Sequence, residues 1–220
     1  MIIPTFRREK QLYKKGYRFV AGIDEVGRGP LAGPVIACAV VISLSRLKDK
    51  YCTANLPDSF YKKNNNVRDS KCLTPLQRER LYKVLTNDKN INYAVGIVSE
   101  KIIDKINILK ASLLAMKKAV ENLEIKPDFL LLDGRWTIKN YPVSQTAIPN
   151  GDKYVFSIAV ASIIAKVTRD RLLVRYDKKY PNYGFAKHKG YGTKLHLEML
   201  KKYGPCRLHR KSFRPVKEMV

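Results

Sequence analysis

The alternation of apolar and polar positions along the chain predicts an α/β fold. Apolar, often β-branched runs bounded by turn residues predict strands at residues 18–24, 35–43, 93–99, 129–132 and 143–148. Longer segments with helical periodicity predict helices at residues 76–85, 100–106, 107–123, 157–180 and 193–203. Strands that come early and then alternate with helices indicate a mixed sheet with helices packed against it.

Turn and loop signals separate these elements. Thr74 and Pro75 are typical of a helix N-cap and of the first helical position. Residues 44–68 are polar, rich in Lys and Asn and without a clear period, so they predict a long loop, and residues 181–192 predict a second loop of glycine, aromatic and basic residues. The length of 220 residues fits one domain, or one domain with a small appendage.

Carboxylates lie at the ends of two predicted strands. Asp24 and Glu25 end the first strand and run into a Gly/Pro-rich turn, and Asp133 ends another apolar strand and precedes Gly134. Ligands gather at the carboxyl ends of strands in open α/β sheets, so these acids predict a shared site. Asp133 taken alone is equally well explained as the start of an Asp-Gly turn.

Asp170 lies on a predicted helix among apolar neighbours. Helical spacing places it in one stripe with Ile163, Val167 and Val174, and a buried carboxylate in such a stripe needs a cationic partner or a metal ion. The nearest candidate partners in sequence are Lys166 and Arg169. The residues alone leave both readings open, with the metal site slightly favoured.

Carboxylates without histidine or cysteine partners favour hard cations, Mg²⁺ or Mn²⁺. Two such ions about 4 Å apart can clamp the attacking and leaving oxygens of a phosphodiester. Asp24 and Glu25 would point to opposite faces of a regular strand, so both reach one ion only if the chain bends at Glu25. Asp24 is therefore expected to be the central ligand.

The composition indicates a class of binding partner and argues against several other classes of protein. The formal net charge of +24 suits a polyanion such as nucleic acid, although part of the excess is explained by a Lys-rich compositional bias. No apolar run is long enough to predict a membrane span, and nothing resembles a signal peptide. Four scattered cysteines and three histidines argue against a zinc cluster, and a cytoplasmic protein with free thiols is expected.

Motifs along nearly the whole chain resemble bacterial ribonuclease HII, the type 2 ribonuclease H. The longest is AGIDEVGRGPLAGPV at residues 21–35. It is followed, in the order of that family, by DSKCLT at 69–74, NIL at 107–109, LDG at 132–134, SIIAKVTRD at 162–170, KGYGT at 189–193 and HRKSF at 209–213.

The resemblance implies a ribonuclease H-like fold, a mixed five-stranded sheet flanked by helices. It divides the chain into a catalytic domain at residues 1–180 and a C-terminal helical extension at 181–220 packed on it as one unit. It implies hydrolysis of the RNA strand of RNA–DNA hybrids, nicking 5′ of single ribonucleotides in duplex DNA, and a role in ribonucleotide excision repair. Asp24, Glu25, Asp133 and Asp170 would be the catalytic acids, holding two Mn²⁺ or Mg²⁺ ions.

Substrate contacts are also implied by the resemblance, at Gly27, Arg28, Gly29, Ser70, Lys71 and Tyr191. The Gly-Arg-Gly motif would sense the ribose 2′-hydroxyl through its backbone, and Tyr191 would read the RNA–DNA junction. Ser70 and Lys71 would contact phosphate. Without the family pattern these residues are an ordinary turn, a loop tyrosine and a solvated charge.

Other positions keep two explanations. Asn107 is as well explained as a helix N-cap as by substrate contact, and Asp152 as well by a Gly-Asp turn as by a site. His188 is expected at the surface in preference to a DNA contact, and Cys38 in the core.

The Gly-Arg-Gly motif and the short N-terminal segment argue against ribonuclease HIII, which has an extra N-terminal domain. We expect a monomer without an evident sliding-clamp peptide. The alternatives are a non-catalytic nucleic-acid binding protein, against which the four acids argue, and a nuclease of the same fold with another substrate.

Overall fold

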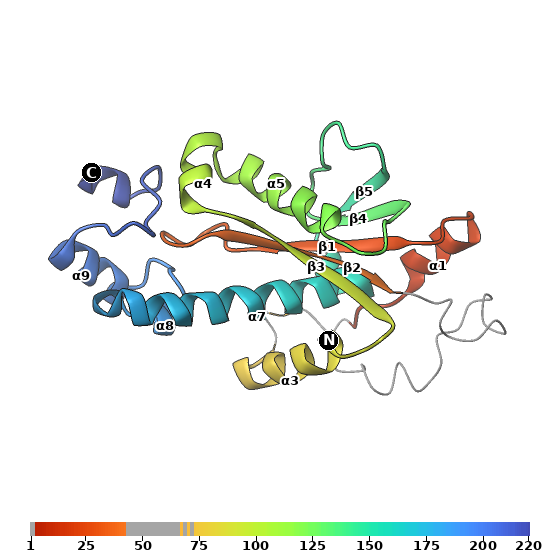
Figure 1. Ribbon diagram of the computed structural model, residues 1–220, viewed down its shortest axis with the longest axis horizontal. Helices are drawn as coiled ribbons and strands as arrows, with labels where there is room; N and C mark the ends of the chain where they lie inside the picture. The colour runs from red at the N-terminus through yellow and green to blue at the C-terminus, as the bar shows by residue number, and fades with distance from the viewer. Residues whose placement is uncertain (1–2, 43–66, 68–69, 71–72) are drawn as a thin grey trace.

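The computed structural model describes residues 3–42, 67, 70 and 73–220, and its centre is one mixed sheet of five strands (Figure 1). The strands are β1 (Val20–Val26), β2 (Val35–Ile42), β3 (Ile91–Val98), β4 (Phe129–Asp133) and β5 (Ser144–Ile148). Their order is β3-β2-β1-β4-β5; β1, β2 and β3 are antiparallel neighbours, whereas β1, β4 and β5 run parallel. The predicted α/β fold with a mixed five-stranded sheet is confirmed, and each predicted strand is present.

Helices cover both faces of this sheet (Figure 1). One face carries α4 (Glu100–Ile106) and α5 (Ile108–Glu121), and the other carries the long α7 (Phe156–Lys179), against which α3 (Pro75–Thr86) packs. The remaining helical segments are α1 (Arg7–Lys14), α6 (Gly151–Tyr154), α8 (Phe185–His188), α9 (Lys194–Tyr203) and the 3₁₀ turns η3 (Pro181–Tyr183) and η4 (Val216–Met219).

Strand β2 shows how the sequence pattern builds this three-layer arrangement. All eight of its residues are buried, and alternate side chains enter different cores. Cys38 and Val40 join the cluster that includes α7 and α3, whereas Ala37 and Ala39 join the cluster that includes α5. A strand buried on both faces is a continuous apolar run, which is the pattern that identified it.

Local signals account for several helix starts. Thr74 is the N-cap of α3 and Pro75 its first residue, both as predicted, and Gln77 completes a reciprocal capping box with Thr74. The side chain of Asn107 accepts a hydrogen bond of 3.1 Å from the Lys110 N–H, so the N-cap explanation of Asn107 is confirmed. Cys38 is buried, also as predicted.

Helix α1 was missed because basic residues dominate it and leave no apolar stripe. The buried Glu9 anchors it: its Oε1 accepts hydrogen bonds from the Ser157 N–H at 2.9 Å and hydroxyl at 2.7 Å, at the start of α7. The prediction of one loop over residues 181–192 was wrong, because η3 and α8 lie within it, and α9 is followed by η4. Nearly all of the predicted loop at 44–68 lies outside the described residues.

The C-terminal segments pack on the rest of the chain through a shared apolar cluster. Ala32 and Leu173 meet Phe185 and Leu208 there. In the described part of the chain, no helix combines the length and apolar character needed to cross a membrane.

Candidate active site

The parallel pairing of β1 and β4 brings two of the predicted acids together. Ile23 is in register with Leu132, so Asp24 and Asp133 are the next residues on the two neighbouring strands. Asp24 lies opposite Cys38, whose side chain faces α7, and Asp133 is two residues after Leu131, which packs on Ile158 of α7. Both carboxylates therefore lie on the α7 face, at the carboxyl ends of adjacent strands.

Asp24 is the most enclosed of the four acids, with 6% of its surface exposed. Its Oδ1 accepts a hydrogen bond of 2.7 Å from the Glu25 N–H, and its carboxylate also interacts with the Ser162 hydroxyl on α7. Burial raises the pKa of Asp24 well above its usual value, and the charges of Glu25, Asp133 and Asp152 raise it further. Several negative charges thus share one small, poorly solvated volume.

Glu25 faces the opposite side of the sheet from Asp24, and the bend that would bring them together is absent. The ladder with β2 continues through Asp24 and Glu25 to Val26 without a bulge, and Glu25 lies opposite Ala37 on the α5 face. The paired part of β4 ends before this point, so the Glu25 carboxylate still feels Asp133 past the strand end. Burial raises the pKa of Glu25, and nearby Arg28 opposes that shift.

Arg28 forms an ion pair of 3.5 Å with Glu25, between a half-exposed guanidinium and a carboxylate that is 11% exposed. The guanidinium is thus placed beside the acids from the turn that follows β1. In this position it neutralises part of their charge while remaining open to solvent.

Asp133 is oriented by the short helix α6. Its Oδ1 accepts a hydrogen bond of 2.6 Å from the Gly151 N–H, and a side chain at Gly151 would meet Ile158 at 2.7 Å. The next residue, Asp152, is buried and close enough to raise the pKa of Asp24. The Gly-Asp turn expected for Asp152 is wrong, because Gly151 and Asp152 begin helix α6, and the buried carboxylate lies beside the site.

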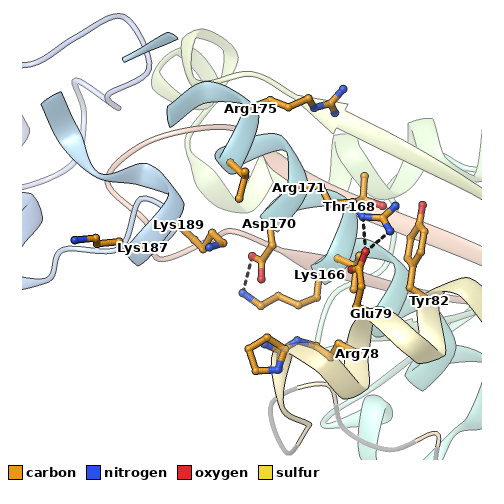
Figure 2. A pocket seen from close by; sticks show the side chains of 13 residues that line it. Arg78, Glu79, Tyr82, Lys166, Thr168, Asp170, Arg171, Arg175, Lys187 and Lys189 are labelled. Atoms are coloured by element: carbon orange, nitrogen blue, oxygen red, sulfur yellow. Dashed lines mark hydrogen bonds and ion pairs between the residues drawn. The ribbon is translucent and has the colours of Figure 1, made fainter. Parts of the chain in front are cut away.

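Asp170 does not join the other acids directly. Its Oδ1 lies 2.8 Å from the Lys166 Nζ, and both side chains are about one-fifth exposed (Figure 2). The predicted apolar stripe was wrong in part, because Val174 is exposed and Asp170 lies in an open groove. Ser162, which interacts with Asp24, is two helical turns before Asp170 on α7, and Lys166 lies between them.

The donor chemistry of these acids fits a hard divalent cation. Among the described residues, no three Asp, Glu, His or Cys side chains are gathered closely enough to hold an ion as they stand. Asp24 and Asp133 instead accept hydrogen bonds from backbone N–H groups, and Asp170 pairs with Lys166. The candidate ligands supply only oxygen, and a cation would relieve the repulsion that raises the pKa of Asp24.

The turn after β1 is fixed by a buried arginine of α7. Arg169 donates to the carbonyls of Pro34 at 3.1 Å, Ala32 at 3.0 Å and Lys189 at 2.9 Å. Gly27 has a φ of +94°, and a side chain there would overlap the Arg169 side chain, with Cδ at 2.8 Å. Glycine at this position is therefore required by both the backbone and the packing.

Arg210 holds the same turn from the C-terminal segment. It donates to the carbonyls of Gly27 at 2.6 Å, Arg28 at 2.9 Å and Gly33 at 2.8 Å, and is fully buried. Burial lowers the pKa of Arg210 to about 9, which leaves the guanidinium charged at neutral pH. Sequence reasoning gave Arg210 no role, because its partners are carbonyls from another part of the chain.

Tyr191 lies beside the Gly-Arg-Gly turn. Its ring carbon Cε1 would be 3.9 Å from a Cβ built on Gly29, and the ring is 42% exposed. The two loops are also joined through the Leu31 N–H, which donates to the Gly190 carbonyl at 2.8 Å. The structure thus brings together the two segments that the sequence motifs implied as substrate contacts.

The remaining residues considered from the sequence are Ser70, Lys71 and His188. The buried Ser70 hydroxyl is 2.9 Å from the Ser162 hydroxyl, which links the start of α3 to the Asp24 side of α7. Lys71 lies outside the described residues. His188 is buried, so the prediction of a surface role was wrong; its ring is held by the Tyr183 carbonyl at 2.7 Å and the Gly190 N–H at 3.1 Å.

Comparisons with known proteins agree with the motifs. The family model "Ribonuclease HII" matches residues 21–216. Ribonuclease HII of Caldicellulosiruptor bescii is 50% identical over 208 residues, which cover 94% of this chain and 92% of that protein.

Solved structures show the same fold. The crystal structure of ribonuclease H2 from Pyrococcus horikoshii is 29% identical, with a TM-score of 0.70 over 91% of this chain and 96% of that one. A ribonuclease HIII solved in complex with Mn²⁺ is 16% identical, with a TM-score of 0.64 over 91% of this chain and 68% of that one.

Proposed function

The chain belongs to the ribonuclease HII family of endoribonucleases, which act on RNA–DNA hybrids, and we propose that it also nicks duplex DNA 5′ of a single embedded ribonucleotide. One observation carries this proposal: the exposed ring of Tyr191 lies beside Gly29, at the open side of the Gly-Arg-Gly turn. Such a nick begins the removal of ribonucleotides from DNA, so we also propose a role in ribonucleotide excision repair.

The turn is suited to recognising a 2′-hydroxyl. The carbonyls of Gly27 and Arg28 are occupied by Arg210, so the turn is held rigid. Among the described residues other than its chain neighbours, Tyr191 alone lies within 4 Å of a Cβ built on Gly29, at 3.9 Å. A sugar can therefore approach the backbone at Gly29 closely, with the Tyr191 ring beside it. The 2′-hydroxyl is the group that distinguishes RNA from DNA, and Tyr191 is placed to contact the adjoining nucleotide.

The four acids are proposed as ligands of two Mg²⁺ or Mn²⁺ ions. Asp24 and Asp133 are the principal ligands because they share one face at adjacent strand ends, and Glu25 reaches the site past the end of β4. Asp170 joins when its carboxylate leaves Lys166. When bound, the ions would activate water and stabilise the leaving 3′-oxygen, which gives 3′-hydroxyl and 5′-phosphate ends.

Basic residues near Asp170 are proposed to hold the sugar–phosphate backbone. A groove of about 830 Å³ between α3, α7 and α8 is lined by Arg78, Lys166, Arg175, Lys187 and Lys189 (Figure 2). Cations along one groove release counterions when they neutralise phosphates, so binding is expected to weaken steeply with salt. Ser70 and Lys71, which precede α3 in the sequence, are proposed to contact the phosphate near the cleaved bond.

The test is incision of a DNA duplex that contains one ribonucleotide. The wild-type protein with Mg²⁺ or Mn²⁺ is expected to cut 5′ of that ribonucleotide, and a chelator should abolish the cut. Asp24→Asn is expected to lower the rate by at least about a hundredfold, because it removes a ligand charge at the ion site. Glu124→Gln is the matched control, since it removes the same charge from an exposed position that none of the four acids contacts.

Two results would overturn the proposal. Metal-independent, salt-sensitive binding without cleavage would identify a non-catalytic nucleic-acid binding protein. Unchanged selectivity for the ribonucleotide junction in Tyr191→Ala would favour a nuclease with another substrate preference; Tyr203→Ala, which removes an exposed tyrosine from α9, controls for the loss of a surface ring.

A further inference from the structure

Three histidines with no part in this mechanism lie behind the Tyr191 loop. His188 comes from α8, His196 from α9 and His209 from the segment that follows, and all three are buried. The rings of His188 and His196 are stacked with centroids 4.2 Å apart, and those of His196 and His209 are 5.2 Å apart. A hydrogen bond joins His196 to His209, and His188 and His196 are hydrogen-bonded to the backbone of the loop.

The order of these hydrogen bonds fixes the position of each ring proton. The Cys206 N–H lies 2.9 Å from His209 Nδ1, which must therefore accept, while the Cys206 carbonyl is farther away at 3.3 Å. A neutral His209 then carries its proton on Nε2 and donates to His196 Nε2 at 3.0 Å. His196 in turn carries its proton on Nδ1 and donates to the Tyr191 carbonyl at 2.9 Å.

The loop is held from several sides around its exposed tyrosine. The Gly190 N–H donates to His188 Nδ1 at 3.1 Å, so His188 donates through Nε2 to the Tyr183 carbonyl at 2.7 Å. The Tyr191 carbonyl also accepts from the Thr193 N–H at 2.8 Å. The backbone of the loop is thus fixed while the Tyr191 ring stays open to solvent beside Gly29.

We infer that His209 and His196 form a hydrogen-bond relay that positions Tyr191 for discrimination of the ribonucleotide junction. This inference rests on the proposed junction function. The two histidines are positioning residues, because they touch neither substrate nor the four acids and act only through the Tyr191 backbone. Each must be neutral, since a second proton on His196 Nε2 would face the His209 Nε2–H across 3.0 Å, and a second proton on His209 Nδ1 would face the Cys206 N–H across 2.9 Å.

The surroundings keep both rings neutral. Burial, together with the neighbouring histidines, lowers the pKa of His196 to about 4 and that of His209 to about 4. Tyr183 and Phe185 pack against His209, and Phe185 also packs against His196. Asp177 on α7 raises the pKa of His188, and Lys189 in the loop lowers it.

The first test compares two variants of one packed cluster. His196→Phe keeps an aromatic ring but removes both relay bonds, whereas Phe185→Leu loosens the packing and leaves every relay bond in place. Rates are measured on a duplex with one ribonucleotide and on an all-RNA/DNA hybrid. His196→Phe is expected to lower the ratio of junction to hybrid cleavage about tenfold, the equivalent of one buried hydrogen bond, and Phe185→Leu to leave it unchanged.

The second test reads the protons directly and does not depend on activity or on the folding of a variant. Ring ¹⁵N–¹H correlation spectra of the wild-type protein should show a protonated Nε2 on His209 and a protonated Nδ1 on His196. The opposite tautomers, or an unchanged cleavage ratio in a folded His196→Phe, would overturn the inference. If the wild type fails to cut the junction duplex, the proposed function fails, and the tautomers still decide the hydrogen-bond order.

Discussion

Substituting alanine for Gly22 tests the tightest contact between the sheet and α7. A Cβ on Gly22 would lie 2.5 Å from the Ile158 backbone nitrogen and closer still to Ser157. Ordinary carbon contacts begin at about 3.5 Å, so β1 and α7 must separate by about 1 Å. Such overpacking costs about 1–3 kcal/mol, and the upper end, about 3 kcal/mol, applies because the neighbour is backbone.

The same displacement is expected to lower activity. Gly22 is two residues before Asp24 on the same face of β1, and α7 carries Ser162 and Asp170. Moving these elements apart by about 1 Å is expected to slow cleavage by up to about a hundredfold. For a domain of this size, about 3 kcal/mol corresponds to a fall in Tm of about 6–12 °C, which circular dichroism would measure alongside cleavage of an RNA–DNA hybrid.

Gly96→Ala is the matched control for this experiment. Its Cβ would meet the α5 backbone, with the Ala119 nitrogen at 2.6 Å, but α5 carries none of the four acids. We expect a similar loss of stability with little change in the rate per folded molecule. A Tm for Gly22→Ala within about 2 °C of the wild type, together with full activity, would refute the argument from packing.

Three further predictions concern charges. Burial raises the pKa of Asp24, so this carboxyl group binds its proton more tightly in the folded protein than in the unfolded chain. The stability of the wild type therefore falls as the pH rises above about 4. Asp24→Asn should be more stable than the wild type at pH 8, as measured by urea unfolding. Burial also raises the pKa of Glu9, so the stability of Glu9→Gln relative to wild type should increase from pH 4 to pH 8. Lys166→Met frees Asp170 from its ammonium partner, and titration calorimetry with Mn²⁺ should show severalfold tighter binding.

Each of these three predictions has an outcome that would contradict it. Lower stability of Asp24→Asn at pH 8 would mean that the carboxylate is not under repulsion there. A pH-independent difference between Glu9→Gln and wild type would contradict a shifted carboxyl group. Unchanged or weaker Mn²⁺ binding by Lys166→Met would show that the ion pair with Asp170 does not compete with the metal.

Much of the fold follows from short-range patterns in the sequence. Three features of the structure follow directly from a local sequence signal. They are the apolar run of β2, the acids at the carboxyl ends of β1 and β4, and the N-cap at Thr74. The carboxyl ends of neighbouring parallel strands meet, which is why the sequence suggested a shared site for Asp24 and Asp133; the parallel pairing of β1 and β4 places the two residues side by side.

Other features depend on contacts between distant parts of the chain. Whether Lys166 or Arg169 would pair with Asp170 was open, and the carbonyls of Pro34 and Ala32 decided it by engaging Arg169. His188 was predicted at the surface because an isolated polar side chain in a basic loop usually lies there. It is buried because Tyr183 of η3, the Gly190 backbone and His196 of α9 complete its surroundings.

The most direct test of the account is product analysis on a DNA duplex that carries one ribonucleotide, with Mg²⁺ or Mn²⁺ present. We expect a single nick 5′ of the ribonucleotide, with 3′-hydroxyl and 5′-phosphate ends, that disappears with chelator and in Asp24→Asn. A nick on the 3′ side, or equal cleavage by wild type and Asp24→Asn, would contradict it.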